Sequence, residues 1–249
     1  MDEEKKETPV VAEKKKRDFL LPASILISAL LISISLVYNA GKKSDAAQNT
    51  ANLAGAAQNT AEITLPPITS ADHIEGNPNA PVKIVEYSDL ECPFCKEFHS
   101  TLKALSGIYG DQVAIVYRHY PIPQLHPKAP HEAQAAECAF KLGGNNAFWS
   151  FIDQVFAITP SNNGLDPAEL PKIAGQIGLD VNEFNSCLSS DYGQALITQE
   201  SQDAVTAGAQ GTPYSIVVNN AGKKYVINGA LPLANVRSII DQALKDSNS

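Results

Sequence analysis

Hydrophobic and polar positions divide this chain into an apolar run near its start and a longer part in which strand-like and helix-like patterns alternate. Residues 19–38 are apolar except for Pro22 and four serines, and no side chain from residue 19 to residue 41 is charged. A run of this length is enough to span a membrane. The alternative is a cleaved signal peptide, but its apolar region is usually about 7–15 residues long and ends in small residues. The length of the run and the bulky Tyr38 favour a retained transmembrane anchor.

Basic residues flank this run unequally. Lys14, Lys15, Lys16 and Arg17 precede it, whereas only Lys42 and Lys43 follow. Because the flank richer in Lys and Arg stays in the cytoplasm, residues 1–18 are predicted to be cytoplasmic and the rest to be exported. The protein is therefore expected to be a single-pass membrane protein whose main domain lies on the extracytoplasmic face.

A polar segment separates the apolar run from the rest of the chain. Residues 39–67 are rich in Ala, Asn, Gln, Thr and Gly, and the pentamer Ala-Ala-Gln-Asn-Thr occurs at 46–50 and again at 56–60. So little apolar surface cannot offset the entropy of folding. We interpret residues 39–67 as a flexible stalk and residues 68–249 as the folded domain.

The folded domain begins with a strand pattern followed by a helix pattern. Val82–Ser88 is apolar and β-branched, which predicts a buried strand. Cys95, Phe98, Leu102 and Leu105 then recur at helical spacing and predict one buried helix face. Further patterns predict a strand at 113–120, a hairpin of 216–218 with 225–227, and helices at 131–142, 147–157, 167–177, 181–189 and 192–207.

Charge excludes one class of function. The net charge is −8, and it lies wholly beyond residue 67, because acids and bases balance before that point. The folded domain has no cluster of Lys and Arg that could neutralise phosphates. We therefore expect no nucleic-acid partner.

Cysteine spacing introduces candidate chemistry. Cys92 and Cys95 form a C-x-x-C pair, and Pro93 stands where the predicted helix begins. Cys92 is thus expected at the exposed helix tip, where backbone N–H groups and the helix dipole favour a thiolate. Cys95 points inward, so the two sulfurs suit thiol–disulfide exchange, with Cys92 attacked and Cys95 resolving. Half of a zinc site, or a purely structural disulfide, is the alternative.

Two residues outside the pair are candidates on weaker grounds. Glu86 lies six residues before Cys92 on the predicted strand, and it could accept the proton of Cys95 or simply face solvent. Pro213 precedes a strand-like run, but an X-Pro bond is usually trans.

The other cysteines are far apart in the sequence. Cys138 shares a helical face with Ala135 and Leu142, and Cys187 shares one with Phe184 and Leu188. Two buried thiols in an exported domain favour a structural disulfide, Cys138–Cys187. A second redox relay is the alternative, although this pair lacks the C-x-x-C spacing.

Residues 72–95, which read DHIEGNPNAPVKIVEYSDLECPFC, resemble the DsbA-like branch of the thioredoxin superfamily. The similarity continues in order at 118–121 (RHYP), 135–139 (AAECA), 148–149 (FW) and 211–213 (GTP), and covers about residues 70–245.

The resemblance implies an α/β thioredoxin-like fold with an inserted helical subdomain at about 125–208, here preceded by one transmembrane helix. It also implies a cis bond at Thr212–Pro213 facing the disulfide and a buried acid at Glu86. Under this reading Cys92, Cys95, Glu86 and Pro213 are catalytic, and Pro93, Phe94 and Thr212 contact substrate. No cofactor or metal is expected.

The expected function is that of a disulfide oxidase, which passes the Cys92–Cys95 disulfide to exported proteins with free thiols. The resemblance suggests a quinone-linked membrane protein as the re-oxidising partner. A reductase or isomerase would use the same motif, because direction depends on reduction potential. A non-catalytic exported peptide-binding module is the alternative from another class.

Overall fold

A five-stranded sheet forms the centre of the computed structural model, which describes residues 63–247. The strands are β1 (His73–Glu75), β2 (Val82–Ser88), β3 (Val113–His119), β4 (Tyr214–Asn219) and β5 (Lys224–Asn228). They are ordered β1-β3-β2-β4-β5, with β2 parallel to β3 and the other neighbours antiparallel. Ser88 pairs with His119, so β2 and β3 end together at one edge of the sheet.

Helix α2 (Pro93–Tyr109) covers one face of this sheet and places the cysteines. Its buried side chains include Cys95, Phe98, Leu102 and Leu105, which confirms the predicted helix face. They share a core with Val82 and Ile84 of β2. Helix α7 (Leu233–Ser247), which the sequence analysis did not predict, adds its buried side chains to the same core.

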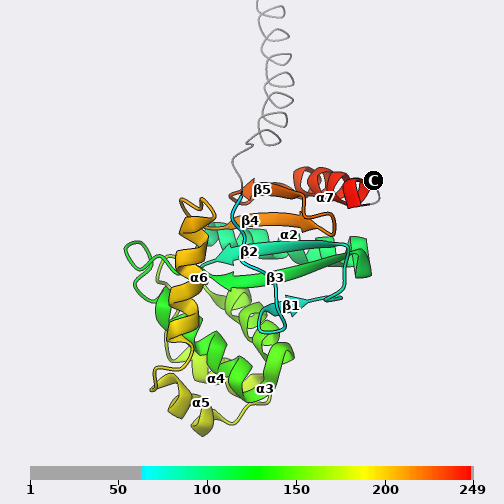
Figure 1. Cartoon of the computed structure of the whole chain (residues 1–249). Coiled ribbons are helices and arrows are strands. Elements are labelled where there is room, and N and C mark those ends of the chain that lie inside the picture. The colour runs from blue at the N-terminus through cyan, green and yellow to red at the C-terminus, as the bar shows by residue number, and fades with distance from the viewer. Residues whose placement is uncertain (1–62, 248–249) are drawn as a thin grey trace, which may run out of the picture. The chain divides into compact units, whose positions relative to one another are not determined.

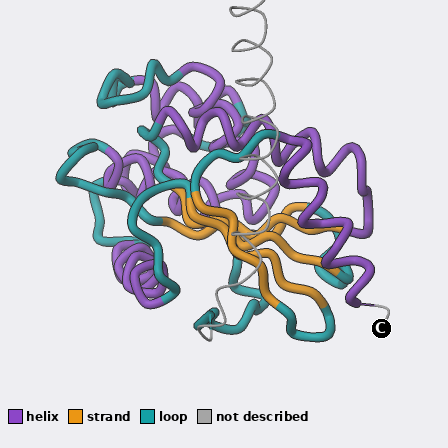
Figure 2. Tube along the Cα trace, turned by 90° about the horizontal axis from the view of Figure 1, so that it is seen from above, coloured by secondary structure: helices purple, strands orange, loops and turns teal. Residues whose placement is uncertain are grey.

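The helical insertion comprises α3 (Ala129–Ile158), α4 (Glu169–Gln176), α5 (Val181–Leu188) and α6 (Gln194–Thr206). Figure 1 shows α3, α4 and α5 close together, with α6 running separately beside the sheet, and Figure 2 shows helices on either side of the strands. Buried side chains of α3, α4 and α5 belong to the core that α2 shares, whereas Ala204 of α6 packs on the opposite face of the sheet. Gly144 interrupts α3 with φ 70° and ψ −164°, a conformation that glycine can adopt. This kink lies between the two helices that the sequence predicts at 131–142 and 147–157. Cys138 of α3 and Cys187 of α5 form the predicted disulfide across 49 residues.

The described chain begins with an extended segment, residues 63–70, which we call the strap. Ile63, Leu65 and Ile68 pack against buried side chains on the face of the sheet opposite α2. The buried Arg118 guanidinium donates hydrogen bonds to the carbonyls of Pro66 and Pro67 and to the Asp72 carboxylate. The sequence pattern assigns residues 63–67 to the stalk, but Ile63 and Leu65 pack on the folded domain, so these residues belong to it.

The predicted cytoplasmic segment 1–18, the anchor 19–38 and most of the stalk lie outside the described residues. Among residues 63–247, no helix is both long and apolar enough to cross a membrane.

Candidate active site

Cys92 lies where β2 gives way to α2, at the edge of the sheet where β2 and β3 end. It is the N-cap of α2, with extended backbone angles of φ −76° and ψ 123°, and Pro93 is the first helical residue. The backbone N–H groups of Phe94 and Cys95 donate to its sulfur. The sequence predicts an exposed sulfur at the helix tip, but Cys92 is only 4% exposed, with Thr212 beside it.

These surroundings stabilise Cys92 as a thiolate. The hydrogen bond from the Cys95 thiol lowers the pKa of Cys92 most, burial opposes it, and Thr212 and the two backbone N–H groups lower the pKa further, to about 6. Cys92 is therefore mostly ionised at neutral pH.

Cys95 is held in the opposite state. Its side chain is fully buried, and burial followed by the proximity of Cys92 raises its pKa well above the usual value. The backbone N–H of Asp89 lies 3.4 Å from Cys95 Sγ and donates to it. The pair therefore consists of one thiolate near the surface and one protonated thiol beneath it.

Glu86 lies on the α2 side of β2 with Val82 and Ile84, which decides between the inward and solvent-facing positions that the sequence leaves open. It is 1% exposed, and the Ser88 hydroxyl donates to its carboxylate at 2.9 Å. Burial raises its pKa to about 7, an effect that His99 and Ser88 oppose. The charge on Glu86 also raises the pKa of Cys95, so the two groups are close enough to interact.

The chain crosses in front of Cys92 at residues 212–213. The Thr212–Pro213 bond is cis, as the resemblance implied, and the Thr212 carbonyl oxygen lies 3.5 Å from Cys92 Sγ, where it accepts a hydrogen bond only from the protonated thiol. Phe94, predicted to contact substrate, is 60% exposed beside the pair. Residues from two separate parts of the sequence, 86–95 and 212–213, thus meet at one edge of the sheet.

Comparison with known proteins agrees with this geometry. The sequence model of the family described as Thioredoxin matches residues 68–242. The crystal structure of Pseudomonas aeruginosa DsbA2 is 32% identical, with a TM-score of 0.61, and the match covers 72% of this chain and 98% of that chain. The chain is a DsbA-like member of the thioredoxin superfamily.

Two further matches are more limited, because one supports the fold alone and the other covers a small part of a longer protein. Oxidised BdbD from Bacillus subtilis has a TM-score of 0.63 at 22% identity, covers 74% of this chain and 98% of its own, and supports the fold alone. A protein named Na(+)/H(+) antiporter NhaA 3 from Salinispora tropica is 32% identical over 191 residues, or 76% of this chain. The match spans only 28% of that antiporter, so its name describes a much longer protein.

Asp89 organises the DsbA-like site in a way that sequence reasoning missed. Its buried carboxylate accepts hydrogen bonds from the backbone N–H groups of Glu91 at 2.8 Å and Ile122 at 2.9 Å. His126 Nδ1 lies 2.9 Å from the same carboxylate. Asp89 therefore fixes the turn before Cys92 to the loop that follows β3.

Glu91 and His99 also have structural partners. The Glu91 carboxylate accepts from the backbone N–H groups of Asn163 and Leu165, so it is directed into the helical insertion. His99 Nε2 lies 2.7 Å from Asp153.

One buried cluster contains the side-chain types that bind metals. Nε2 of His73 lies 2.6 Å, and Nε2 of His119 lies 3.0 Å, from one carboxylate oxygen of Glu137. Burial raises the pKa of Glu137, but hydrogen bonds from both histidines outweigh it and lower the pKa to about 2. Neither Nδ1 has a partner within the described chain, whereas metal-bound histidines usually donate that N–H. The arrangement supports a hydrogen-bonded cluster joining β1, β3 and α3.

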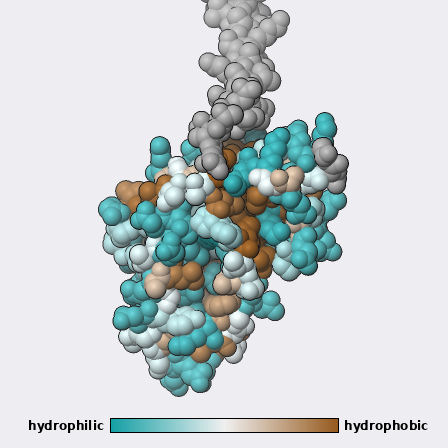
Figure 3. Space-filling model, in the orientation of Figure 1, coloured by the Kyte–Doolittle hydropathy of each residue, from teal (hydrophilic) through white to brown (hydrophobic). Residues whose placement is uncertain are grey.

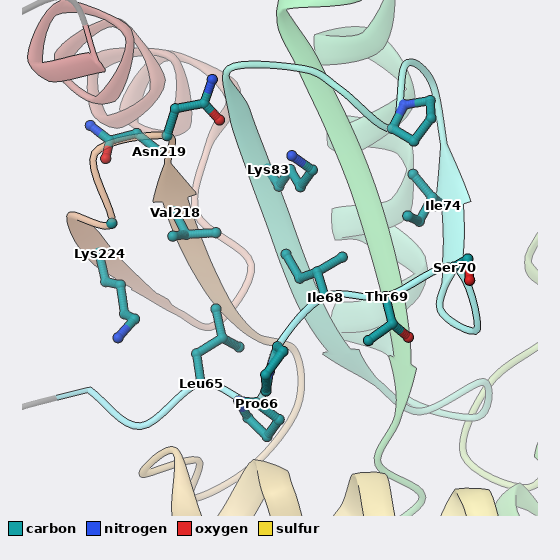
Figure 4. A pocket seen from close by; sticks show the side chains of 14 residues that line it. Leu65, Pro66, Ile68, Thr69, Ser70, Ile74, Lys83, Val218, Asn219 and Lys224 are labelled. Atoms are coloured by element: carbon teal, nitrogen blue, oxygen red, sulfur yellow. The ribbon is translucent and has the colours of Figure 1, made fainter.

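A large hollow lies away from the cysteines, between the strap and the sheet face opposite α2. Its volume is about 580 Å³, and Figure 4 shows Leu65 and Ile68 of the strap on the same side of the sheet as Lys83 and Val218. Figure 3 shows hydrophobic residues gathered on this face of the molecule. Lys83 lies near the start of β2, whereas Cys92 follows its end, so the hollow is not part of the redox site.

The geometry predicts how Cys95 controls the ionisation of Cys92. Cys95→Ala removes the strongest influence that lowers the pKa of Cys92, so this pKa should rise from about 6 toward the ordinary 9.0. Cys95→Ser retains a hydroxyl donor and should raise it less. Ultraviolet absorbance of the thiolate, followed against pH in the reduced protein, measures both. Equal Cys92 pKa values in the two variants and the wild type would refute this role of Cys95.

Burial of Glu86 predicts a pH-dependent loss of stability. Its pKa is raised from 4.5 to about 7 in the folded protein, so its contribution is full below pH 4.5 and is lost as pH rises to 7. Glu86→Gln removes the buried charge and should raise the free energy of unfolding at pH 8 by on the order of 3 kcal/mol, with little change at pH 4. Urea unfolding at both pH values measures this. Glu97→Gln, on the exposed face of α2, is the control; an equal effect of both substitutions would contradict the prediction.

Proposed function

We propose that this protein is a membrane-anchored, extracytoplasmic disulfide oxidase that donates the Cys92–Cys95 disulfide to exported proteins with free thiols. The observation that carries the proposal is the position of Cys92 Sγ at the start of α2, where the Cys95 thiol and two backbone N–H groups donate to it and lower its pKa to about 6, whereas burial raises the pKa of Cys95. A stabilised thiolate favours the reduced form of the pair. A pair whose reduced form is stabilised is a strong oxidant, because its disulfide is readily given up.

The proposed reaction begins with the disulfide form. A client thiolate attacks Cys92 Sγ, a bond forms between the two sulfurs, and the Cys92–Cys95 bond breaks with Cys95 leaving as a thiolate. Cys95 then takes up a proton, which its raised pKa favours and which Glu86, with a pKa of about 7, is placed to supply. The second client thiolate attacks the client sulfur of the mixed disulfide, and Cys92 leaves as a thiolate. The client loses two electrons and the Cys92–Cys95 pair gains them.

The residues around Cys92 are placed to contact a client chain in such a mixed disulfide. The Thr212 carbonyl lies at the sulfur, and the exposed Phe94 stands beside it. A client chain passing Cys92 would lie against Pro93, Phe94, Thr212 and Pro213. These residues are proposed to bind the segment that carries the client cysteine.

The sequence supports the proposed location, and the family resemblance supports the proposed re-oxidising partner. The apolar run 19–38 and the basic residues before it support an anchor with a cytoplasmic N-terminus. The Cys138–Cys187 disulfide is consistent with an oxidising compartment outside the cytoplasm. Re-oxidation requires an acceptor for two electrons, and a quinone-linked membrane protein is the proposed one.

The direction of electron flow is the decisive property to test. Equilibration of the Cys92–Cys95 pair with glutathione buffers should give a potential nearer to the value of about −120 mV known for DsbA than to about −270 mV for thioredoxin. A value near that of thioredoxin would instead favour a reductase. Cys95→Ser should accumulate exported clients linked through Cys92, and the matched variant Cys92→Ser should not.

A further inference from the structure

A groove lies near the active site, with α6 on one side and the loop that follows β3 and the start of α3 on the other. It consists of two neighbouring hollows of about 480 Å³ and 330 Å³, which share Pro130, Ile197 and Thr198 as lining residues. We call it the proline groove, because Pro121, Pro123, Pro127 and Pro130 all line it. Its volume lies in the range of ligand-binding clefts, about 300–1,000 Å³.

Hydrogen bonds connect the proline groove to the cysteines. The Ile122 N–H donates to the Asp89 carboxylate at 2.9 Å, and the Asp89 N–H donates to Cys95 Sγ at 3.4 Å. The Tyr120 N–H donates to the Ser88 carbonyl at 2.7 Å. Tyr120 and Ile122 both line the groove. One end of the groove is thus fixed to the turn that carries the redox pair.

The length of the groove suits an extended peptide. Lining residues on α6 run from Gln194 to Val205, which is about 17 Å of helix at 1.5 Å per residue. An extended chain rises about 3.3 Å per residue, so about five residues would occupy the groove.

The lining selects the chemistry of that peptide. Among the described residues, those lining the two hollows include no Asp, Glu, Lys or Arg, and the exposed His131 of the smaller hollow is the one imidazole. A charged side chain entering the larger hollow, which lies nearer the redox pair, would lose hydration without gaining an ion pair. Ile197 and the 53% exposed Val205 offer apolar contacts, whereas Gln124 and Gln202 offer amides that could bond to a peptide backbone.

We propose that the proline groove binds the segment next to the reacting cysteine of a client and favours extended, apolar, uncharged sequences. The inference rests on the proposed function, since it names the clients that the same redox site would use. It adds a specificity site on the α6 side of the Thr212–Pro213 crossing.

The test uses three synthetic peptides, each with one cysteine flanked by about five residues on either side. The flanks are alanine and valine, the same with two glutamates, or the same with two lysines. Each peptide reacts with the disulfide form of the protein: the peptide sulfur bonds to Cys92 and the Cys92–Cys95 bond breaks. The readout is the second-order rate constant of each peptide divided by that of 2-mercaptoethanol, a small uncharged thiol that cannot fill the groove.

For the wild type, we expect the apolar peptide to have the largest ratio. Val205→Lys should lower the ratio for the apolar peptide about tenfold and raise the ratio for the glutamate peptide. Val205→Glu should likewise lower the ratio for the apolar peptide and raise the ratio for the lysine peptide. Val181→Lys is the matched control, since Val181 is also an exposed valine on a helix, at 39%, and does not line the groove.

Equal ratios for all three peptides, or ratios that change as much in Val181→Lys as in Val205→Lys, would overturn the proposal that the proline groove binds the client segment. A reduction potential near that of thioredoxin in the glutathione measurement would instead overturn the proposed oxidase function. The two outcomes are independent, because the peptide ratios do not depend on the sign of net electron flow.

Discussion

The hydrogen bonds that converge on the sulfur of Cys92 are the interaction on which the rest of the site depends. They come from the Cys95 thiol and from the first N–H groups of α2, and they lower the pKa of Cys92 to about 6 despite its burial. Without them, a sulfur that is only 4% exposed would stay protonated and unreactive. The two thiols differ in pKa because Cys92 lies at the start of α2, whereas Cys95 lies in the first turn of this helix and is fully buried in the core.

The fold maintains this arrangement from several directions. Phe98, Leu102 and Leu105 hold α2 on the sheet, so the helix start cannot move away from the end of β2. Asp89 holds the turn before Cys92 to the loop after β3. The strand that follows Pro213 pairs with β2, which brings Thr212 to the sulfur. Each contact joins segments distant in the sequence, so the site is a property of the whole domain.

Local patterns were enough to predict the part of the site that lies within one segment. The helical spacing after Cys92 predicts the inward Cys95, and helical faces predict the Cys138–Cys187 disulfide. Helix α7 was missed although Val236, Ile240 and Ala243 recur at helical spacing, and β1 has only three residues, too few for a visible pattern. The Asp89 network, the strap and the cover over Cys92 could not be predicted, because each depends on contacts between distant segments.

If the pair is the proposed oxidant, the folded protein favours the reduced form, with Cys92 as a thiolate, over the Cys92–Cys95 disulfide. The most direct measurement compares urea unfolding of the two forms at pH 7, with the Cys138–Cys187 disulfide intact in both. The reduced form should unfold at the higher urea concentration, and this advantage should shrink as pH falls through about 6, where Cys92 gains its proton. A disulfide form that is the more stable at pH 7 would contradict the claim.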